Sequence, residues 1–311
     1  MFSAPDCNFK KVVVAGGSGY LGSHVADALS IAGHEVIIFD LVSSPWLRED
    51  QTMIVGSLLD KDSVFAAING ADVVYHFAGI ADIGESKSRP RDTLEFNIMG
   101  TVNLLDAAVK ANVSRFVFAS TMYVYNDLGS FYGASKQSAE VIISTYSREY
   151  DLQFTLLRYG SLYGPRAQKW NGVRKYVEKI IESGVIEYSG SGSERREYIH
   201  VSDAARLSVN ILAEEYVNVA ITVTGQQVLT SSELMQMIFE ICNLPMNVKW
   251  IEPKSNSNDH YSITPYKYNP VPASKIMPKH YIDLGQGIQD VIEEVHTDLN
   301  KKKTTPNSIL N

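Results

Sequence analysis

Near its N-terminus the chain reads Lys11-Val-Val-Val-Ala-Gly16-Gly-Ser-Gly19-Tyr-Leu-Gly22-Ser-His24. The apolar run 11–15 predicts a buried strand, and the apolar spacing within 20–32 predicts a helix. The glycines therefore lie at a strand-to-helix turn, where a backbone without side chains can approach a pyrophosphate closely. Free N–H groups and the positive end of the helix dipole favour the negative charge of that pyrophosphate. This turn predicts a dinucleotide site.

The next expected strand, 35–40, ends in Asp40. A carboxylate at this position suits the two hydroxyls of an adenosine ribose and repels a 2′-phosphate. The sequence therefore favours NAD over NADP. The glycine spacing, Gly-x-x-Gly-x-x-Gly, is one residue longer than the commoner form of dinucleotide-binding folds.

Segments of strand and helix type continue to alternate beyond Asp40. The expected strands are 52–55, 72–77, 115–119 and 154–157, and the expected helices between them are 61–69, 93–111 and 133–150. This order predicts an α/β fold with a Rossmann-like, doubly wound parallel sheet that helices cover on both faces. Ligands bind such sheets beyond the carboxyl ends of the strands, so the residues that follow each strand are the first candidates for function.

The alternation changes near Tyr163, which indicates a second, smaller part of the chain. We expect an NAD-binding Rossmann domain in residues 1–162, with a return segment near 196–222. Residues 163–311 are expected to form mainly a smaller α/β substrate-binding lobe. The polar tail 298–311 is expected to be frayed.

Composition excludes several classes of function. The 311 residues carry a net charge of -7, which gives no support to a nucleic-acid surface. No apolar stretch reaches the length of about 18 residues that a membrane helix needs, and the N-terminus lacks the pattern of a signal peptide, so we expect a cytoplasmic protein. The two cysteines, Cys7 and Cys242, lie far apart, and we expect neither a disulfide framework nor a metal site.

Tyr132 and Lys136 lie four residues apart in an expected helix and therefore share one helix face. A phenol ionises near pKa ~10 in water, and a neighbouring ammonium stabilises the phenolate, which suits a general base or acid. Thr121, which follows Ser120 at the end of an expected strand, can donate a hydrogen bond to the same substrate oxygen. Lys136 can also hold the nicotinamide ribose. These side chains fit hydride transfer at a carbinol carbon.

With the glycine turn and Asp40, this constellation resembles the extended short-chain dehydrogenase/reductases, specifically their NAD-dependent nucleotide-sugar epimerase/dehydratase family. The chain is particularly similar to the UDP-galactose 4-epimerase branch of that family. The segments that carry the similarity, besides those quoted above, are 76–79, 84–86, 97–103, 154–166 and 190–203. The resemblance extends from Lys11 to about Leu212.

The resemblance implies a site for NAD, a site for a nucleotide-diphosphate sugar, and a catalytic group made of Thr121, Tyr132 and Lys136. The implied cofactor-binding residues are Gly16, Ser18, Gly19, Tyr20, Leu21, Gly22, Asp40, Ser57, Leu58, Phe77, Ala78, Gly79, Asn97, Ser120, Tyr132, Lys136 and Tyr159. The implied substrate-binding residues are Ala81, Thr121, Ser161, Arg166 and Arg196. Arg196 is expected to face the diphosphate, which a guanidinium can bind by paired hydrogen bonds.

The chain also departs from the family pattern at four places. Ser57 stands where relatives usually carry Asp near the adenine, Ala81 where the galactose epimerases have Lys, and Ser161 where an Asn commonly binds the substrate. The segment 124–131, between the expected fifth strand and Tyr132, is much shorter than usual. A shorter segment there can leave a more open sugar pocket.

The residues after Thr121 bear on the choice of reaction. The 4,6-dehydratases of the family carry Asp-Glu there, whereas this chain has Met122 and Tyr123, so the second proton transfer of a dehydration has no evident agent. Reversible hydride transfer at the sugar C4 is the expected chemistry, and a 4-epimerase is the favoured interpretation. A nucleotide-sugar 4-dehydrogenase, a less favoured 4,6-dehydratase and a catalytically silent NAD-binding regulatory protein are the alternatives.

The expected partners follow from the same resemblance. We expect a nucleotide-diphosphate sugar as the substrate and no nucleic-acid or membrane partner. The helices expected over 93–111 and 133–150 resemble those that form a four-helix interface in the family, and their outer positions carry apolar residues. The chain is therefore expected to form a homodimer.

Overall fold

The computed structural model describes residues 11–226, 228–252, 262–263 and 265. All of these belong to one unit, which ends at Asn269. The tail 298–311, for which fraying is expected, lies outside the described residues, as does the whole second unit, Pro270–Asn311.

A seven-stranded sheet forms the centre of this unit. Its order is β10-β6-β5-β4-β1-β2-β3, and every neighbouring pair is parallel. The strands are β1 (Lys11–Ala15), β2 (Glu35–Asp40), β3 (Gln51–Val55), β4 (Val73–His76), β5 (Arg115–Thr121), β6 (Phe154–Tyr159) and β10 (Val219–Val223). The chain order reverses between β1 and β4, which is where such sheets bind their ligands. The predicted doubly wound parallel sheet is confirmed.

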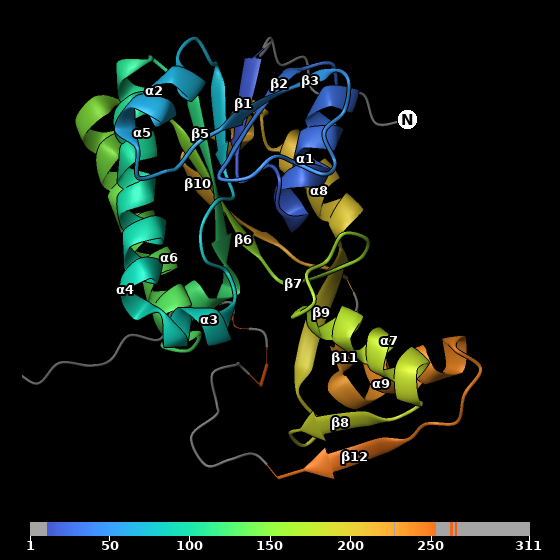
Figure 1. Cartoon of the computed structure of the whole chain (residues 1–311). Coiled ribbons are helices and arrows are strands. Elements are labelled where there is room, and N and C mark those ends of the chain that lie inside the picture. Colours follow the sequence, from blue (N-terminus) through green and yellow to red (C-terminus); the bar gives the residue numbers. More distant parts are fainter. Residues whose placement is uncertain (1–10, 227, 253–261, 264, 266–311) are drawn as a thin grey trace, which may run out of the picture. The chain divides into compact units, whose positions relative to one another are not determined.

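Helices cover both faces of the sheet (Figure 1). One face carries α2 (Lys61–Ile68), α5 (Gly100–Lys110) and α6 (Ser130–Tyr150), and the other carries α1 (Tyr20–Ile31) and α8 (Val201–Asn210). On α1, Val25, Ala26 and Leu29 point into the core at helical spacing. Because the sheet is covered from both sides, its central strands are mostly apolar, as in residues 12–15 of β1 and 73–75 of β4.

The segment 93–111, expected as one helix, is interrupted. It contains the end of α4 (Pro90–Leu94), a π-helical turn η1 (Glu95–Met99) and α5, and a short helix α3 (Ile83–Ser88) precedes them. A π turn adds a residue to the helical repeat and redirects the side chains within it. In η1 this buries the polar side chain of Asn97, which is 3% exposed.

The connection from β5 to α6 is short and tightly folded. It contains a single 3₁₀ turn, η2 (Met122–Tyr125), and α6 begins at Ser130, three residues before the expected start at Gly133. Gly129 has a φ of 84°, and a Cβ at this position would lie 2.8 Å from the ring of Tyr123, so glycine is required there. As a result, Tyr132 lies in the first turn of α6.

Residues beyond β6 form a smaller lobe and then return to the sheet. The lobe contains β7 (Ser161–Tyr163), α7 (Gly172–Ser183), β8 (Ile186–Ser189), β9 (Arg195–His200), β11 (Val228–Thr230), α9 (Ser231–Ile241) and β12 (Val248–Ile251). Ile180, Met235 and Phe239 form the centre of its apolar core. The chain returns to the main sheet through α8, η3 (Glu214–Tyr216) and β10. A domain boundary at residue 162 stays a prediction, because the described residues on both sides belong to one unit.

Candidate active site

A cavity of about 1570 Å³ lies at the carboxyl ends of the central strands. The glycine turn after β1, Asp40 at the end of β2, Phe77 after β4 and Thr121 at the end of β5 all line it. These strand ends lie at one edge of the sheet, so residues far apart in sequence meet there. The cavity exceeds the usual ~300–1,000 Å³ of a pocket for a single small ligand, and it has room for a cofactor and a substrate together.

Backbone segments meet so closely at the glycine turn that only glycine fits there. A Cβ on Gly16, whose φ is 85°, would lie 2.3 Å from the amide nitrogen of Ala78. A Cβ on Gly22 would lie 2.2 Å from the carbonyl oxygen of Gly16. The turn therefore cannot carry side chains at these positions, and it presents bare backbone next to the N-terminus of α1. This arrangement fits the pyrophosphate of a dinucleotide.

Asp40 is held at the edge of the same turn. Its Oδ2 accepts a hydrogen bond from the backbone amide of Ser18 at 2.9 Å, and the hydroxyl of Ser18 donates to the carbonyl oxygen of Val42 at 2.8 Å. These contacts connect β2 to the glycine turn. Asp40 lines the cavity, and its role on an adenosine ribose stays a prediction.

Tyr132 and Lys136 lie on the cavity side of α6. The ammonium nitrogen Nζ of Lys136 is 5.9 Å from the centre of the Tyr132 ring and 4.5 Å from the centre of the Phe118 ring. Nζ also donates a hydrogen bond to the carbonyl oxygen of Ala119 at 2.7 Å. The lysine is therefore fixed between Tyr132 and the end of β5.

Burial changes the protonation of this lysine. The side chain of Lys136 is 6% exposed, and burial lowers its pKa to about 8, although the carboxylate of Glu140 acts in the opposite direction. A lysine with this pKa remains largely protonated at neutral pH and can lose its proton slightly above it. It can therefore support a phenolate at Tyr132 electrostatically.

Thr121 completes the group at the end of β5. Its hydroxyl accepts a hydrogen bond from the amide of Tyr123 at 3.3 Å, and the Tyr123 ring meets the Tyr132 ring edge-on at 6.3 Å between centres. Met122 is fully buried. The positions after Thr121 therefore place an aromatic ring at the cavity and no carboxylate.

Most of the residues expected at the site line this single cavity. They are Gly16, Ser18, Gly19, Tyr20, Leu21, Gly22, Asp40, Ser57, Leu58, Phe77, Ala78, Gly79, Ala81, Ser120, Thr121, Tyr132, Lys136, Tyr159, Ser161 and Arg196. Asn97 and Arg166 do not line it. The functional role of each residue stays a prediction.

Asn97 supports the cavity wall from behind. Its Oδ1 accepts from the amide of Ile80 at 2.8 Å, and its Nδ2 donates to the carbonyl oxygen of Ile80 and to the hydroxyl of Ser135, both at 2.9 Å. A Cβ on Gly79 would lie 2.5 Å from the same Oδ1. The π turn thus uses Asn97 to join the segment after β4 to α6.

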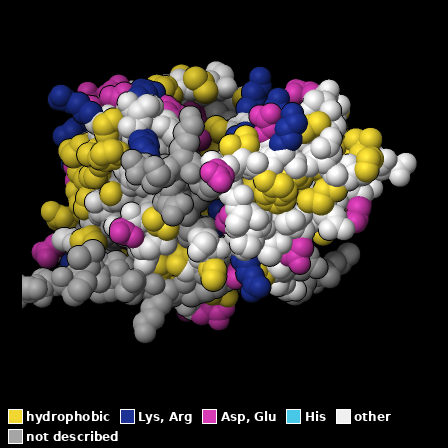
Figure 2. Space-filling model, turned by 90° about the horizontal axis from the view of Figure 1, so that it is seen from below, with side chains coloured by type: hydrophobic (Ala, Val, Ile, Leu, Met, Phe, Trp, Pro, Cys, Tyr) yellow, Lys and Arg dark blue, Asp and Glu magenta, His cyan; other side chains and the backbone are white. Residues whose placement is uncertain are grey.

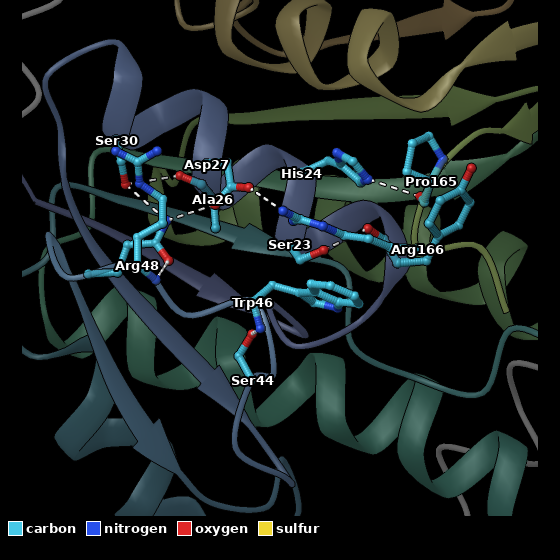
Figure 3. Close-up of polar contacts among 12 residues, drawn as sticks. Ser23, His24, Ala26, Asp27, Ser30, Ser44, Trp46, Arg48, Pro165 and Arg166 are labelled. Atoms are coloured by element: carbon cyan, nitrogen blue, oxygen red, sulfur yellow. Dashed lines mark hydrogen bonds and ion pairs between the residues drawn. The ribbon is translucent and has the colours of Figure 1, made fainter.

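Arg166 differs from the expected placement on the substrate. Its Nη2 forms an ion pair with Asp27 of α1 at 2.8 Å, and its guanidinium lies 4.7 Å from a ring centre of Trp46 (Figure 3). The preceding carbonyl oxygen, that of Pro165, lies 3.1 Å from Nε2 of His24. A φ of 63° at Arg166 turns the chain at this point. The side chain therefore joins β7–α7 to α1 and to the loop after β2.

Sequence reasoning missed the wall that the smaller lobe provides. Additional lining residues include Gln168, Trp170, Asn171, Lys175, Tyr176, Lys179, Tyr188 and Lys249. Lys175 and Lys179 lie four residues apart on α7, so their spacing is a signal that a search for basic helix faces could have found. Which face of α7 meets the cavity depends on the packing of the lobe, and local sequence does not contain that information.

The shortened segment before Tyr132 is held by one side chain of α6. Nε2 of Gln137 donates to the carbonyl oxygens of Val124 and Asn126 at 3.1 and 3.0 Å. The three other departures from the family pattern, Ser57, Ala81 and Ser161, all line the cavity. They therefore alter the surface that a ligand meets.

Comparison with known proteins agrees with this geometry. The model of the NAD dependent epimerase/dehydratase family matches residues 12–221, which is more than half of the chain. A UDP-N-acetyl-alpha-D-glucosaminuronate decarboxylase from Bacillus cytotoxicus is 29% identical, over 75% of this chain and 80% of its own length. A putative UDP-glucose 4-epimerase from Methanocaldococcus jannaschii is 26% identical, over 73% of this chain and 81% of its own.

Solved structures show the same fold. The UDP-glucose 4-epimerase of Thermotoga maritima, crystallised with UDP-glucose, superposes with a TM-score of 0.74 and 27% identity, covering 83% of this chain and 89% of the other. The UDP-glucose 4-epimerase of Thermus thermophilus, in complex with NAD, gives a TM-score of 0.74 and 25% identity, covering 83% and 90%.

Proposed function

Because the chain belongs to the NAD-dependent epimerase/dehydratase family, we propose that it is a nucleotide-sugar 4-epimerase. Its cofactor is NAD. The observation that carries the proposal is the meeting of Thr121, Tyr132 and Lys136 with the glycine turn and Asp40 in one cavity. The same cavity has room beside the cofactor for a second ligand of nucleotide-sugar size.

Three residues of the chain have separate roles in the proposed reaction. Bound NAD supplies a reversible acceptor for the hydride from the sugar C4. Tyr132 takes the proton of the C4 hydroxyl as that carbon is oxidised, and returns it when the ketone is reduced. The ammonium of Lys136 stabilises the phenolate, and the hydroxyl of Thr121 donates to the reacting oxygen. Epimerisation follows when the 4-keto sugar rotates within the site and is then reduced on the opposite face of C4.

The surroundings of Thr121 favour epimerisation over dehydration. Removal of water from C5 and C6 needs an additional acid and base, and the residues after Thr121 are the buried Met122 and the aromatic Tyr123. The connection before Tyr132 is short, and Gln137 holds it. We infer that a short segment at this place leaves the sugar pocket more open, which supports rotation of a ketone within the site.

The smaller lobe suits the nucleotide part of the substrate. Arg196 of β9, Lys175 and Lys179 of α7 and Lys249 of β12 line this side of the cavity. A cluster of cationic side chains favours a diphosphate. Relatives described as binding UDP-glucose support a nucleoside diphosphate sugar as the substrate class.

The test is turnover on a panel of nucleotide sugars. Full-length protein is incubated with UDP-glucose, UDP-N-acetylglucosamine and UDP-glucuronic acid, and products are separated by chromatography. The proposal requires that the C4 epimer of a substrate is formed and that no NADH accumulates. Accumulating NADH with a keto sugar identifies a dehydrogenase, and release of CO₂ identifies a decarboxylase. Tyr132→Phe must abolish turnover, whereas Tyr216→Phe, on η3 and away from the cavity, must not.

We also propose a homodimer formed through α5 and α6. Large apolar side chains are exposed on α6 and on the segment that leads into α5: Leu94, Met99, Phe131, Val141 and Tyr150. In Figure 2 apolar side chains gather at the left edge, the side on which Figure 1 shows α4, α5 and α6. Exposed apolar patches of this kind are typical of protein interfaces.

In the part of the chain that the structure describes, no helix is long and apolar enough to cross a membrane. Among those same residues no cluster of His, Cys, Asp or Glu is arranged to bind a metal ion.

A further inference from the structure

A largely buried ion pair lies behind the proposed catalytic group. Glu140 of α6 accepts two hydrogen bonds from Arg158 of β6, at 3.0 Å from Nε and 2.6 Å from Nη2. The side chains are 11% and 21% exposed. Removing two charges from water opposes the attraction between them, so such a pair adds little stability compared with apolar residues of the same size. Its place beside the reaction centre indicates another role.

The glutamate fixes the end of β5. The hydroxyl of Ser120 donates to Oε1 of Glu140 at 2.5 Å, and one turn earlier on α6 Nζ of Lys136 donates to the carbonyl oxygen of Ala119 at 2.7 Å. Two successive residues of β5 are therefore held by two successive turns of α6. The next residue of the strand is Thr121, and the preceding turn of the helix carries Tyr132. These contacts set the distance between the two.

The arginine fixes the connection that follows β5. Its Nη1 donates to the hydroxyl of Tyr125 at 2.9 Å, and its guanidinium lies 4.7 Å from the centre of the Tyr125 ring. Tyr125 ends the turn η2, in which Tyr123 packs against Tyr132. The Glu140–Arg158 pair thus holds both the end of β5 and the turn η2 that follows it.

The charge of Glu140 also acts on Lys136. The two residues are four apart on α6 and share a helix face, and both are buried. The carboxylate favours the charged form of the lysine, against the effect of burial, which lowers its pKa to about 8. Tyr132, on the same helix, and His76, on β4, are the other titratable groups facing this lysine.

The side chains around Glu140 and Lys136 determine the net charge of this region. Burial and the neighbouring Lys136 lower the pKa of His76 well below its ordinary value, so this histidine is uncharged at neutral pH. Arg158 and the Tyr125 hydroxyl face Glu140 from β6 and η2. Glu140 is therefore the negative charge that balances Lys136 and Arg158 in this region.

We propose that Glu140 is a positioning residue of the reaction centre: clamped by Arg158, its carboxylate fixes Ser120 and keeps Lys136 in its ammonium form beside Tyr132. The effect of Glu140 on turnover rests on the proposed function. Its effect on the protonation of Lys136 does not, because it depends only on the residues of this chain.

The first test is Glu140→Gln, which keeps the shape of the side chain and removes its charge. The ammonium of Lys136 loses its nearest negative charge, and Arg158 is left unbalanced, so both effects favour the neutral amine. We expect the titration midpoint of Lys136 to fall by about one pH unit. Competitive acetylation of the full-length, nucleotide-free protein with acetic anhydride over a pH series, read by peptide mass spectrometry, measures that midpoint. Glu149→Gln, at an exposed position of the same helix, is the matched control and must leave it unchanged.

A double variant keeps the test decisive if the single variant does not fold. Glu140→Gln/Arg158→Met removes both charges and leaves no unpaired charge buried. We expect a smaller fall of the Lys136 midpoint, still below the wild-type value. Midpoints equal to that of the wild type in every folded variant would overturn the proposal. On an active substrate, the pH profile of kcat/KM must move with the lysine; an inactive wild type whose lysine midpoint still moves would count against the proposed function alone.

Discussion

A Cβ atom on Gly22 would lie 2.2 Å from the carbonyl oxygen of Gly16, although the two residues are six positions apart in the chain. The start of α1 is therefore packed directly on the glycine turn. This contact explains why the spacing of the glycines matters: each one removes a side chain from a place where backbone meets backbone.

Gly22→Ala is expected to disrupt this contact. The added methyl group has no flexible side chain to displace, so the turn must shift, and overpacking of this kind costs about 1–3 kcal/mol of stability. The affinity for NAD should fall at least about tenfold, since the shifted amides no longer meet the pyrophosphate. Calorimetric titration with NAD and chemical denaturation measure the two effects.

Gly172→Ala is the matched control for that variant. Gly172 begins α7, and a Cβ at this position would have no neighbouring atom within 4 Å. Its replacement should change the free energy of unfolding by less than about 1 kcal/mol. Equal effects of the two substitutions on NAD binding would contradict the assignment of the glycine turn.

Asp40→Asn is expected to weaken NAD binding and to reduce the preference over NADP. The amide oxygen can still accept from the amide of Ser18, so the turn is preserved, but the charge that attracts ribose hydroxyls and repels a 2′-phosphate is lost. A hydrogen bond to a charged group contributes about 1.5–3 kcal/mol, so the affinity for NAD should fall by about 10- to 100-fold. Fluorescence titrations with both cofactors give the ratio. Asp62→Asn, at an exposed position on α2, is the control and should leave the ratio of the NAD and NADP affinities unchanged. An unchanged ratio for Asp40→Asn would show that its carboxylate does not face the ribose.

Lys136 is expected to make stability depend on pH in the alkaline range. Its pKa is about 8 in the folded protein and 10.5 in the absence of burial. Between these values the unfolded chain holds a proton that the folded chain has released, so the free energy of unfolding rises with pH by about 1.4 kcal/mol per unit. Below pH 8 the folded protein carries the full unfavourable effect of burying the ammonium.

Lys136→Met isolates this contribution. The difference in unfolding free energy between the variant and the wild type should be constant below pH 8 and should shift in favour of the wild type as pH rises from there. Urea denaturation at several pH values checks this, with Lys61→Met, exposed on α2, as the control. Parallel curves for Lys136→Met and the wild type would show that the lysine is not buried in its charged form. The variant is expected to lose turnover whatever its stability.

Arg166→Met separates a structural role from substrate binding. Loss of the ion pair with Asp27 and of the contact with Trp46 should loosen the loop after β2, whose residues Leu41 and Val42 line the cavity. In a background with Trp170 and Trp250 replaced by Phe, the emission of Trp46 should move to longer wavelength and the Tm should fall.

Arg206→Met, which breaks an exposed ion pair with Asp203 on α8, is the control and should change neither readout. Exposed pairs of that kind contribute little stability. If Arg166→Met weakened only nucleotide-sugar binding, with the emission of Trp46 and the Tm unchanged, Arg166 would be a substrate residue after all.

Local sequence patterns are sufficient to predict part of this structure. The buried strands and the glycine turn follow from short-range rules. β1 is apolar from Val12 to Ala15 and β4 from Val73 to Tyr75, because both faces of the sheet are covered, and a turn that touches neighbouring backbone admits only glycine. The same rules placed Tyr132 and Lys136 on one helix face, because that requires only a spacing of four.

Features that depend on long-range packing could not be predicted in this way. The apolar spacing of 93–111 continues through η1, so nothing in its period reveals the π turn that buries Asn97. The direction of Arg166 depends on a positive φ and on partners more than a hundred residues away in the chain. The lining face of α7 likewise depends on how the smaller lobe packs.

The proposed dimer gives a last prediction. Val141 is 67% exposed on α6 and is one of the exposed apolar residues proposed for the interface, so Glu at this position would place a charge there. If α5 and α6 form the interface, two-fold symmetry places residue 141 of both copies in it, so the substitution buries two unpaired charges in one contact. Such unpaired buried charges are strongly unfavourable. Light scattering at micromolar concentration should therefore show a dimer for the wild type and a monomer for Val141→Glu.

Ile181→Glu provides the matched control, since Ile181 is 72% exposed on α7, outside the proposed interface. It should remain a dimer, and circular dichroism should show that both variants keep the fold. A monomeric wild type would exclude the dimer. Dimers of Val141→Glu together with monomers of Ile181→Glu would move the interface to the smaller lobe, where α7 also lines the cavity, and would make the substrate wall part of the contact between two copies.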